Sequence, residues 1–231
     1  MRAVLDIVAA GALLFAAGVG AAPLAPASYD MPNGNGVASS GEFNYWDLGY
    51  TGSGATTVDN AALSGGLGDL TDGVTTTQNW FQIENAAGSG PYVGWRAAIM
   101  PAPPTVVFHF THAVDVSDIV VHADDSDGAG GVREPASIRL VAGAFDQTFA
   151  IPAHSGAEPF AIDLAGLHGA ALGISGVTSL ALTFTRNAPD EWVFIDEVSF
   201  DGQLSAVPLP GAVGLLLSAL PLLALRRRAR A

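Results

Sequence analysis

Short segments in which apolar and polar residues alternate fill the middle of the chain. In residues 106–110, Val106, Phe108 and Phe110 occupy every second position, which is the period of a strand with one buried face. The other segments of this kind are residues 119–122, 137–141, 145–151, 180–185 and 192–200. Turns rich in Gly, Asp and Asn separate them, and no run of helical period precedes the C-terminal tail. The pattern predicts an all-β fold, an antiparallel β-sandwich.

The N-terminus has the pattern of a secretory signal peptide. Arg2 precedes an apolar run over residues 7–19, and small residues follow at positions 20–22. Val19 and Ala21 fit the two small positions before a cleavage site. We therefore expect residues 1–21 to be removed on export, with an uncleaved N-terminal membrane helix as the alternative.

The C-terminus combines a proline motif, an apolar run and a cluster of arginines. The run covers fifteen uncharged residues from Gly211, or nineteen from Val207, which is marginal against the roughly 20 residues of a helix that spans a bilayer. The positive-inside rule places the arginines on the cytoplasmic side. The motif and the cluster consist of Val207, Pro208, Leu209, Pro210, Arg226, Arg227, Arg228 and Arg230.

This arrangement resembles the PEP-CTERM sorting signal in its VPLPA-type variant, over residues 204–231. The resemblance implies a single hydrophobic transmembrane helix that retains the protein in the inner membrane until an exosortase-type enzyme cleaves it. The processed protein would then belong to the cell surface or the extracellular matrix. A generic tail anchor is the alternative.

The region between the two ends is strongly acidic and lacks cysteine. Residues 22–206 contain four arginines, no lysine and 21 carboxylates, a net charge of −17. Such a surface repels nucleic acid and anionic lipid, and it suits an exterior rich in divalent cations. Because the chain has no cysteine, zinc fingers, thiol redox chemistry and cysteine nucleophiles are excluded.

A series of motifs resembles the galactose-binding-like, discoidin-type domains. In chain order they are residues 70–73 (LTDG), Trp80, residues 90–95 (GPYVGW), the segment 106–110, the acidic loop 124–131 and residues 195–198 (IDEV). The resemblance implies a jelly-roll sandwich of about eight strands over residues 42–203, after an irregular lead-in over residues 22–41. Domains of this kind often bind carbohydrate through loops at one end.

The same resemblance implies a structural Ca²⁺ site. Asp72, Thr77 and Glu197 match the family's oxygen ligands, together with backbone carbonyls of the first loop, and Ca²⁺ prefers such ligands. Strand alternation predicts that Glu197 shares a face with Val193 and Ile195, where a carboxylate needs a cation or hydrogen bonds. An ordinary Asp-Gly turn and a partly exposed glutamate are the alternative.

Residues 124–128 (DDSDG) are a second group of acids. They resemble half of a Ca²⁺ loop, but the closing glutamate of an EF-hand is missing from its usual position. Because neighbouring carboxylates repel one another, we expect them to be solvated in a loop, with Arg133 neutralising part of their charge.

Asn79, Tyr92, Trp95 and Arg133 are predicted to form a carbohydrate-binding rim at one end of the sandwich. A sugar stacks its apolar face on an aromatic ring and hydrogen-bonds through its hydroxyls. The alternative is that Trp95 belongs to the core.

Motifs for catalysis do not emerge from the sequence. Asp190 and Glu191 are adjacent, so a strand would point them to opposite faces, and the five histidines show no metal-ligand spacing. The sequence therefore predicts an exported, non-enzymatic protein that binds extracellular polysaccharide. A structural envelope component without a ligand and a polysaccharide-degrading enzyme are the alternatives.

The sorting interpretation predicts the ends of the exported protein. Mass spectrometry of the protein recovered outside the cell should find an N-terminus at Ala22 and a C-terminus that lacks residues 226–230. An exported protein that still carries the arginine cluster would contradict cleavage of the sorting signal.

Overall fold

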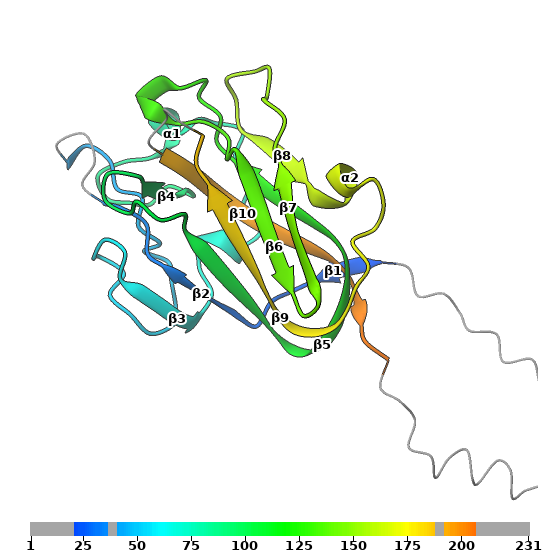
Figure 1. Ribbon diagram of the computed structural model, residues 1–231. Helices are drawn as coiled ribbons and strands as arrows, with labels where there is room; N and C mark the ends of the chain where they lie inside the picture. The colour runs from blue at the N-terminus through cyan, green and yellow to red at the C-terminus, as the bar shows by residue number, and fades with distance from the viewer. Residues whose placement is uncertain (1–20, 37–40, 188–191, 207–231) are drawn as a thin grey trace, which may run out of the picture.

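The computed structural model describes residues 21–36, 41–187 and 192–206. Within these ranges the chain is almost entirely β (Figure 1). The strands are β1 (Ala22–Leu24), β2 (Ser28–Pro32), β3 (Ala62–Gly66), β4 (Val93–Arg96), β5 (Thr105–Ala123), β6 (Ser137–Ala142), β7 (Phe145–Ala150), β8 (Phe160–Asp163), β9 (Ile174–Thr185) and β10 (Trp192–Leu204). The helical segments are η2 (Asp69–Thr71), α1 (Trp80–Ile83), η3 (Ala129–Gly131) and α2 (Leu164–His168).

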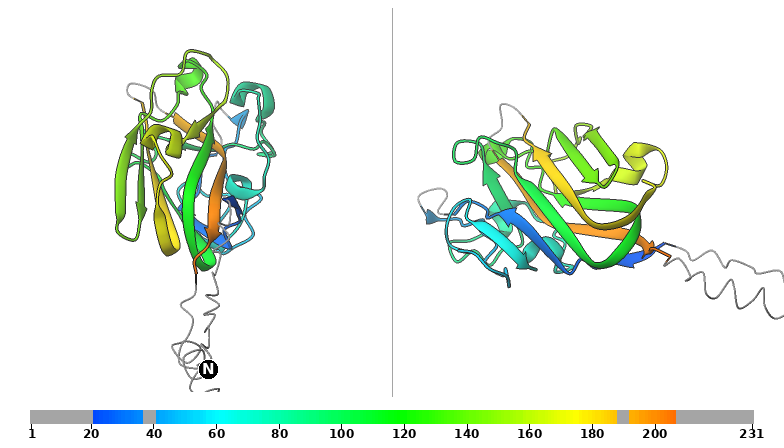
Figure 2. Two further views of the ribbon diagram at one scale, coloured as in Figure 1. Left: turned by 90° about the vertical axis from the view of Figure 1, so that its right-hand side faces the viewer. Right: turned by 60° about the horizontal axis from the view of Figure 1, so that its bottom comes forward.

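The ten strands pair as one open antiparallel sheet that folds over into the layers of a sandwich (Figure 2). The main path runs β1-β10-β5-β9-β6-β7, while β2, β4 and β8 pair from the side and β3 pairs with β2. The first half of β5 pairs with β2 and β9, and its second half pairs with β8 and β10. The predicted antiparallel sandwich is confirmed, with ten strands where the sequence suggested about eight.

β5 is one strand of 19 residues where the alternation predicted two separate ones. Its buried side chains occupy even positions up to Val116 and odd positions from Ile119 onward. The alternation shifts by one residue at Ser117. Asp118 pairs with Asp201 of β10 and Val116 pairs with Gly202, so Ser117 is an extra residue between two consecutive pairs. This β-bulge bends the strand and keeps its apolar residues facing the core on both sides of the bend.

The main core lies between the layers and contains Trp95 at its centre. Trp95 is fully buried, its ring centroid lies 6.3 Å from that of Phe184, and its Nε1 donates to the carbonyl of Pro32 at 2.8 Å. A second, smaller cluster fills the loop end of the sandwich. It consists of Tyr45, Tyr92, Val132, Trp192 and Phe194.

β10 separates the two clusters, since its first seven residues are buried on both faces. Ile195 lies in the main core and Phe194 in the second cluster. Asp196 is an extra residue opposite β5, and after this bulge Val198 returns to the main core. Glu197 therefore points away from the core. The prediction that it shares the face of Ile195 was wrong, because simple alternation ends at the bulge.

Residues 22–41, expected to be an irregular lead-in, contain β1 and β2. β1 pairs with the end of β10, and β2 pairs with β3 and β5. β1 and the end of β10 lie at one end of the sandwich, opposite the loops around α1 and the start of β10 (Figure 1). We call the latter the loop end.

The predicted processing signals fall mainly outside the described residues. Val207, Pro208, Leu209, Pro210 and the arginine cluster lie there, as do residues 1–20. In the part of the chain that the structure describes, helices are too short and too polar to cross a membrane.

Candidate ligand-binding site

The loop end contains a pocket of about 310 Å³ whose walls are mainly aromatic rings. Trp80 comes from α1, Arg96 from the end of β4, and Trp192 from the first position of β10. The described lining is Tyr45, Trp80, Arg96, Gly130, Val132, Trp192 and Phe194. Ring faces with a few polar groups are typical of small-molecule sites. We call this site the aromatic pocket.

Ring contacts fix the shape of the aromatic pocket. The ring of Tyr45 lies 4.5 Å from that of Phe194 and 5.1 Å from that of Trp192, in tilted and edge-to-face arrangements that aromatic pairs favour. The guanidinium of Arg96 lies 5.7 Å from the centre of the Trp192 ring, a cation–π contact. The buried indole N–H of Trp80 has no hydrogen-bond partner among the described residues.

The acidic loop after β5 holds α1, and with it Trp80, in place. The carboxylate of Asp124 accepts hydrogen bonds from Nδ2 of Asn79 at 2.8 Å and from the backbone N–H of Trp80 at 2.9 Å. Nδ2 of Asn79 also donates to Oγ of Ser126 at 3.0 Å. Burial raises the pKa of Asp124 to about 6, although these hydrogen bonds oppose the rise.

The expectation that this loop is solvated holds for Asp127, which is exposed and pairs with Arg133 as predicted, and was wrong for the other two acids. Asp124 and Asp125 are 0% and 1% exposed. Hydrogen bonds from α1 and from the loop itself replace water, which is how a buried polar group avoids a large desolvation cost.

The predicted carbohydrate-binding rim does not form at the surface. Tyr92 and Trp95 are 1% and 0% exposed, so neither ring can stack on a sugar. Asn79 is buried in its contacts with the acidic loop. Arg133 pairs with Asp127 at 2.9 Å. The rim prediction was wrong for both aromatic residues, because the strand pairing of β4 turns them inward.

The predicted Ca²⁺ ligands Asp72 and Glu197 do come together, through the turn after η2. Oε2 of Glu197 accepts from the backbone N–H of Gly73 at 3.0 Å. Burial raises the pKa of Glu197 to about 7, the Gly73 hydrogen bond opposes this rise, and the charges of Asp72 and Asp196 add to it. These neighbouring carboxylates therefore repel one another when ionised.

Thr77 is not part of this arrangement, since its side chain is exposed. The backbone N–H of its neighbour Thr76 instead donates to Oδ2 of Asp196 at 2.8 Å. Oδ1 of Asp196 is buried without a partner, and burial raises the pKa of this carboxyl to about 6. Asp196 is thus an acid of this region that the resemblance did not indicate.

Two further acids extend the buried group. Burial raises the pKa of Asp69 and of Glu84 to about 8, with added repulsion from neighbouring carboxylates. Within the described ranges, the arginines form no ion pair with these two acids, nor with Asp124, Asp196 or Glu197. In those ranges, groups of three or more acidic or histidine side chains arranged to hold a metal ion are also absent.

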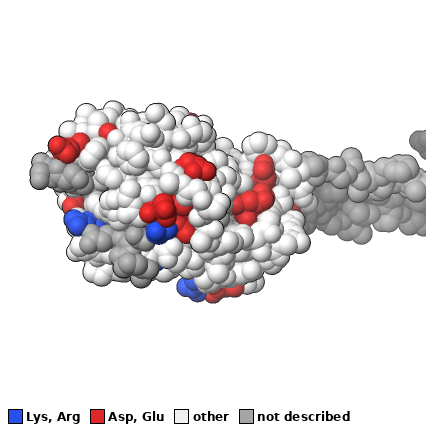
Figure 3. Space-filling model, turned by 90° about the horizontal axis from the view of Figure 1, so that it is seen from above, with Lys and Arg blue, Asp and Glu red and all other residues white. Residues whose placement is uncertain are grey.

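Charge on the surface is mixed. Figure 3 looks at the molecule from above and shows the basic side chains visible there beside acidic ones. On the neighbouring strands β6 and β7, Arg139 and Asp146 form an ion pair at 2.7 Å. Local pairing therefore leaves the acidic excess spread over the surface.

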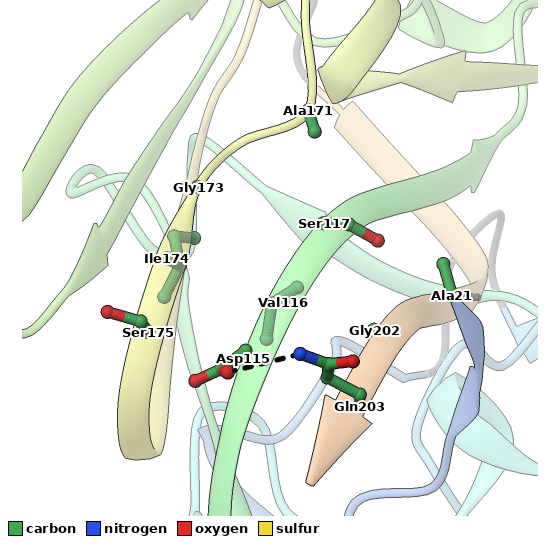
Figure 4. Close-up of a pocket in the computed structure, with 10 residues that line it drawn as sticks. All are labelled: Ala21, Asp115, Val116, Ser117, Ala171, Gly173, Ile174, Ser175, Gly202 and Gln203. Atoms are coloured by element: carbon green, nitrogen blue, oxygen red, sulfur yellow. Dashed lines mark hydrogen bonds between the residues drawn. The ribbon is translucent and has the colours of Figure 1, made fainter. Parts of the chain in front are cut away.

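Another pocket, of about 320 Å³, lies between β5, β9 and the end of β10 (Figure 4). Asp115 there accepts from Oγ of Ser205 at 2.5 Å and from the backbone N–H of Gly176 at 2.9 Å. The amide of Gln203 also points toward it (Figure 4). Because the chain itself supplies these partners, the aromatic pocket is the better candidate for a ligand.

Comparison with protein families identifies the sandwich. Residues 26–145 match the family described as discoidin domain-containing receptor 1/2, DS-like domain. The chain belongs to this family. The discoidin-type resemblance found in the sequence is thereby confirmed, over a range that runs from the segment before β2 to the first residue of β7. No curated protein matches the sequence of this DS-like protein.

Solved structures resemble the DS-like protein over part of its length. The C-terminal domain of a chitobiase from Bacteroides fragilis is 15% identical, with a TM-score of 0.35, and the match covers 57% of this chain and 91% of that chain. The family 32 CBM from C. perfringens NanJ, in complex with galactose, is 8% identical over 48% and 75%, with a TM-score of 0.31. A fucolectin from striped bass (Morone saxatilis) serum is 12% identical over 79% and 75%, with a TM-score of 0.34.

The buried acids predict that the DS-like protein loses stability as the pH rises. The buried acids have pKa values of about 6 to 8 in the folded protein and near 4 in the unfolded chain. Between these pH values the folded protein holds protons that the unfolded chain has released. This stability is present in full below about pH 4 and is lost progressively as the pH rises from about 4 toward 8. His122, whose burial lowers its pKa, acts in the opposite direction. We expect the Tm in EDTA to fall by at least about 5 °C between pH 5 and pH 8.

Asp69→Asn provides the matched test of this pH dependence. It should raise the Tm much more at pH 8 than at pH 5, because most of the penalty for ionising Asp69 in the folded protein arises between these two pH values. Asp146→Asn, at a fully exposed acid paired with Arg139, should raise the Tm at neither pH. A Tm that rises steadily from pH 5 to pH 8 would contradict the proton uptake inferred for these acids.

Proposed function

We propose that this protein binds polysaccharide without catalysis, at the cell surface or in the extracellular matrix, and that a sugar occupies the aromatic pocket. The observation that carries the proposal is a pocket lined by Trp80, Trp192 and Arg96, in which the guanidinium of Arg96 lies over the Trp192 ring. Ring faces match the apolar faces of a sugar, while guanidinium and indole N–H groups donate to its oxygens.

The lining of the pocket supports binding rather than turnover. Hydrolysis of a glycosidic bond normally requires two carboxyl groups on either side of that bond. The described lining of the aromatic pocket contains no acidic side chain. A polysaccharide-degrading enzyme is therefore the weaker alternative.

The terminal segments support export. The predicted signal peptide, the proline motif at Val207 and the arginine cluster together fit secretion, transient retention in the inner membrane and processing by an exosortase-type enzyme. β1 and the end of β10, next to which these segments begin, lie at the end of the sandwich remote from the aromatic pocket. Retention by the C-terminal segment would thus leave the pocket facing away from the membrane.

We also propose that Ca²⁺ stabilises the turn after η2. Asp72, Asp196 and Glu197 offer the oxygen ligands that Ca²⁺ prefers, and the unpartnered Oδ1 of Asp196 fits a cation. Because Glu197 and Asp196 now accept backbone N–H groups, binding would require these carboxylates to turn. The cation would neutralise the repulsion that raises their pKa.

The binding proposal predicts that replacing Trp192 weakens polysaccharide binding. In affinity electrophoresis with galactan, dextran, chitosan or alginate in the gel, the wild type should be retarded by at least one polymer. Trp192→Ala should weaken that affinity at least about tenfold, which corresponds to about 1.4 kcal/mol. Trp46→Ala is the matched control, because the Nε1 of Trp46 bonds to Asp59 outside the pocket.

The same experiment separates the alternatives. If none of the four polymers retards the wild type, the protein is better interpreted as a structural envelope component without a sugar ligand. Release of soluble sugar from a polymer, abolished at a single carboxylate, would favour the enzyme.

The Ca²⁺ proposal predicts a rise in the Tm when EDTA is replaced by millimolar CaCl₂, since a ligand of the folded state stabilises it by mass action. Glu197→Gln should remove most of this rise. Glu158→Gln, at an exposed position, should retain it. An equal rise in both variants would place the cation elsewhere, and no rise in the wild type would refute the site.

A further inference from the structure

A second pocket, of about 420 Å³, lies on the other side of the acidic loop. It is formed by the segment after β7, by β8 and by α2, and its lining includes His154, Ser155, Phe160, Asp163 and Leu167. The rings of His154 and Phe160 are stacked, with centroids 4.4 Å apart and planes 1° from parallel. We call it the His154 pocket.

Two buried carboxylates hold His154 in this position. Its Nδ1 lies 3.3 Å from Oδ2 of Asp125, which is 1% exposed. Its backbone N–H also approaches the carboxylate of Glu134, which is 2% exposed. Side chains fixed in this way by a second layer of buried groups are characteristic of built sites.

The contact with Asp125 determines what His154 offers to the pocket. Nδ1 of His154 faces the Asp125 carboxylate, and a neutral imidazole that donates from Nδ1 leaves Nε2 as an acceptor. Nε2 has no hydrogen-bond partner among the described residues. The pocket thus combines an aromatic wall with an oriented acceptor, which suits a ligand that presents both an apolar face and hydroxyl donors.

The acidic loop connects this pocket to the aromatic pocket. Gly130 and Val132 of the loop line the aromatic pocket, whereas Asp125 and Glu134, near its two ends, hold His154. The loops after β5 and after β7 also lie together at the loop end (Figures 1 and 2). Both pockets therefore share one supporting segment, the connection between β5 and β6.

We propose that the His154 pocket is a second glycan-binding subsite, so that the protein engages two places along a hydroxyl-rich polysaccharide rather than one terminal sugar. The stacked His154–Phe160 pair packs against the apolar part of a sugar, and Nε2 of His154 accepts a hydrogen bond from a hydroxyl. The subsite rests on the proposed function of the aromatic pocket. Two linked contacts raise the affinity for a polymer above that for a single sugar.

The test compares a polymer with a short sugar in the same proteins. Affinity electrophoresis in galactan and in dextran measures binding of the polymer. Quenching of tryptophan fluorescence by galactose or glucose measures binding of a short sugar in the aromatic pocket. Trp80 and Trp192 line that pocket, whereas the described lining of the His154 pocket contains no tryptophan. His154→Ala should weaken retardation by the polymer at least fivefold and leave the sugar concentration at half-quenching unchanged. His112→Ala, at an exposed histidine on β5, is the matched control and should change neither.

His154→Gln guards against loss of folding in the alanine variant. Its side-chain oxygen is also an acceptor, so it should restore part of the polymer affinity, with near-UV circular dichroism as the check of folding. If folded His154→Ala is retarded by the polymer as strongly as the wild type, and its fluorescence is still quenched by the short sugar, the second subsite is overturned and the proposed function stays intact. Absence of both retardation and quenching in the wild type would overturn both proposals.

Discussion

Buried carboxylates without arginine partners hold the loop end of this sandwich together. Asp124 accepts the first backbone N–H of α1, Glu84 accepts that of Tyr92, and Glu197 accepts that of Gly73. Each of these bonds satisfies a backbone donor that water would otherwise satisfy. Since the charges also repel one another, the position of α1, and of Trp80 upon it, depends on how protons or cations neutralise them.

β10 contributes residues both to the group of buried carboxylates and to the apolar core. Its first residues are buried on both faces and supply the aromatic pocket on one side and the main core on the other. The bulge at Asp196 then reverses the phase, so Glu197 meets the turn after η2 while Val198 remains in the core. Without the extra residue, the same sequence would bury Glu197 among apolar side chains.

The sequence predicted those features that depend on local alternation and missed those that depend on distant partners. The strands β5, β6, β7, β9 and β10 follow from their period, but the short strands β1, β2 and β8 were not predicted and form by pairing with β10 and β5. The burial of Asp124 depends on Asn79, 45 positions earlier. Motif order located the loop end, yet alternation does not distinguish a tryptophan in the core, such as Trp95, from one that lines a pocket, such as Trp192.

Trp80 illustrates how closely the side chains are packed at this end of the fold. Its ring is fixed by an edge-to-face contact with Phe43 at 5.0 Å and by Gly130, where a Cβ atom would lie 2.5 Å from the ring. Its buried N–H lacks an acceptor among the described residues, a state that costs about 1–3 kcal/mol. The packing that fixes the ring is therefore achieved at the expense of one polar group, and the neighbours that hold Trp80 in place also close its N–H off from water.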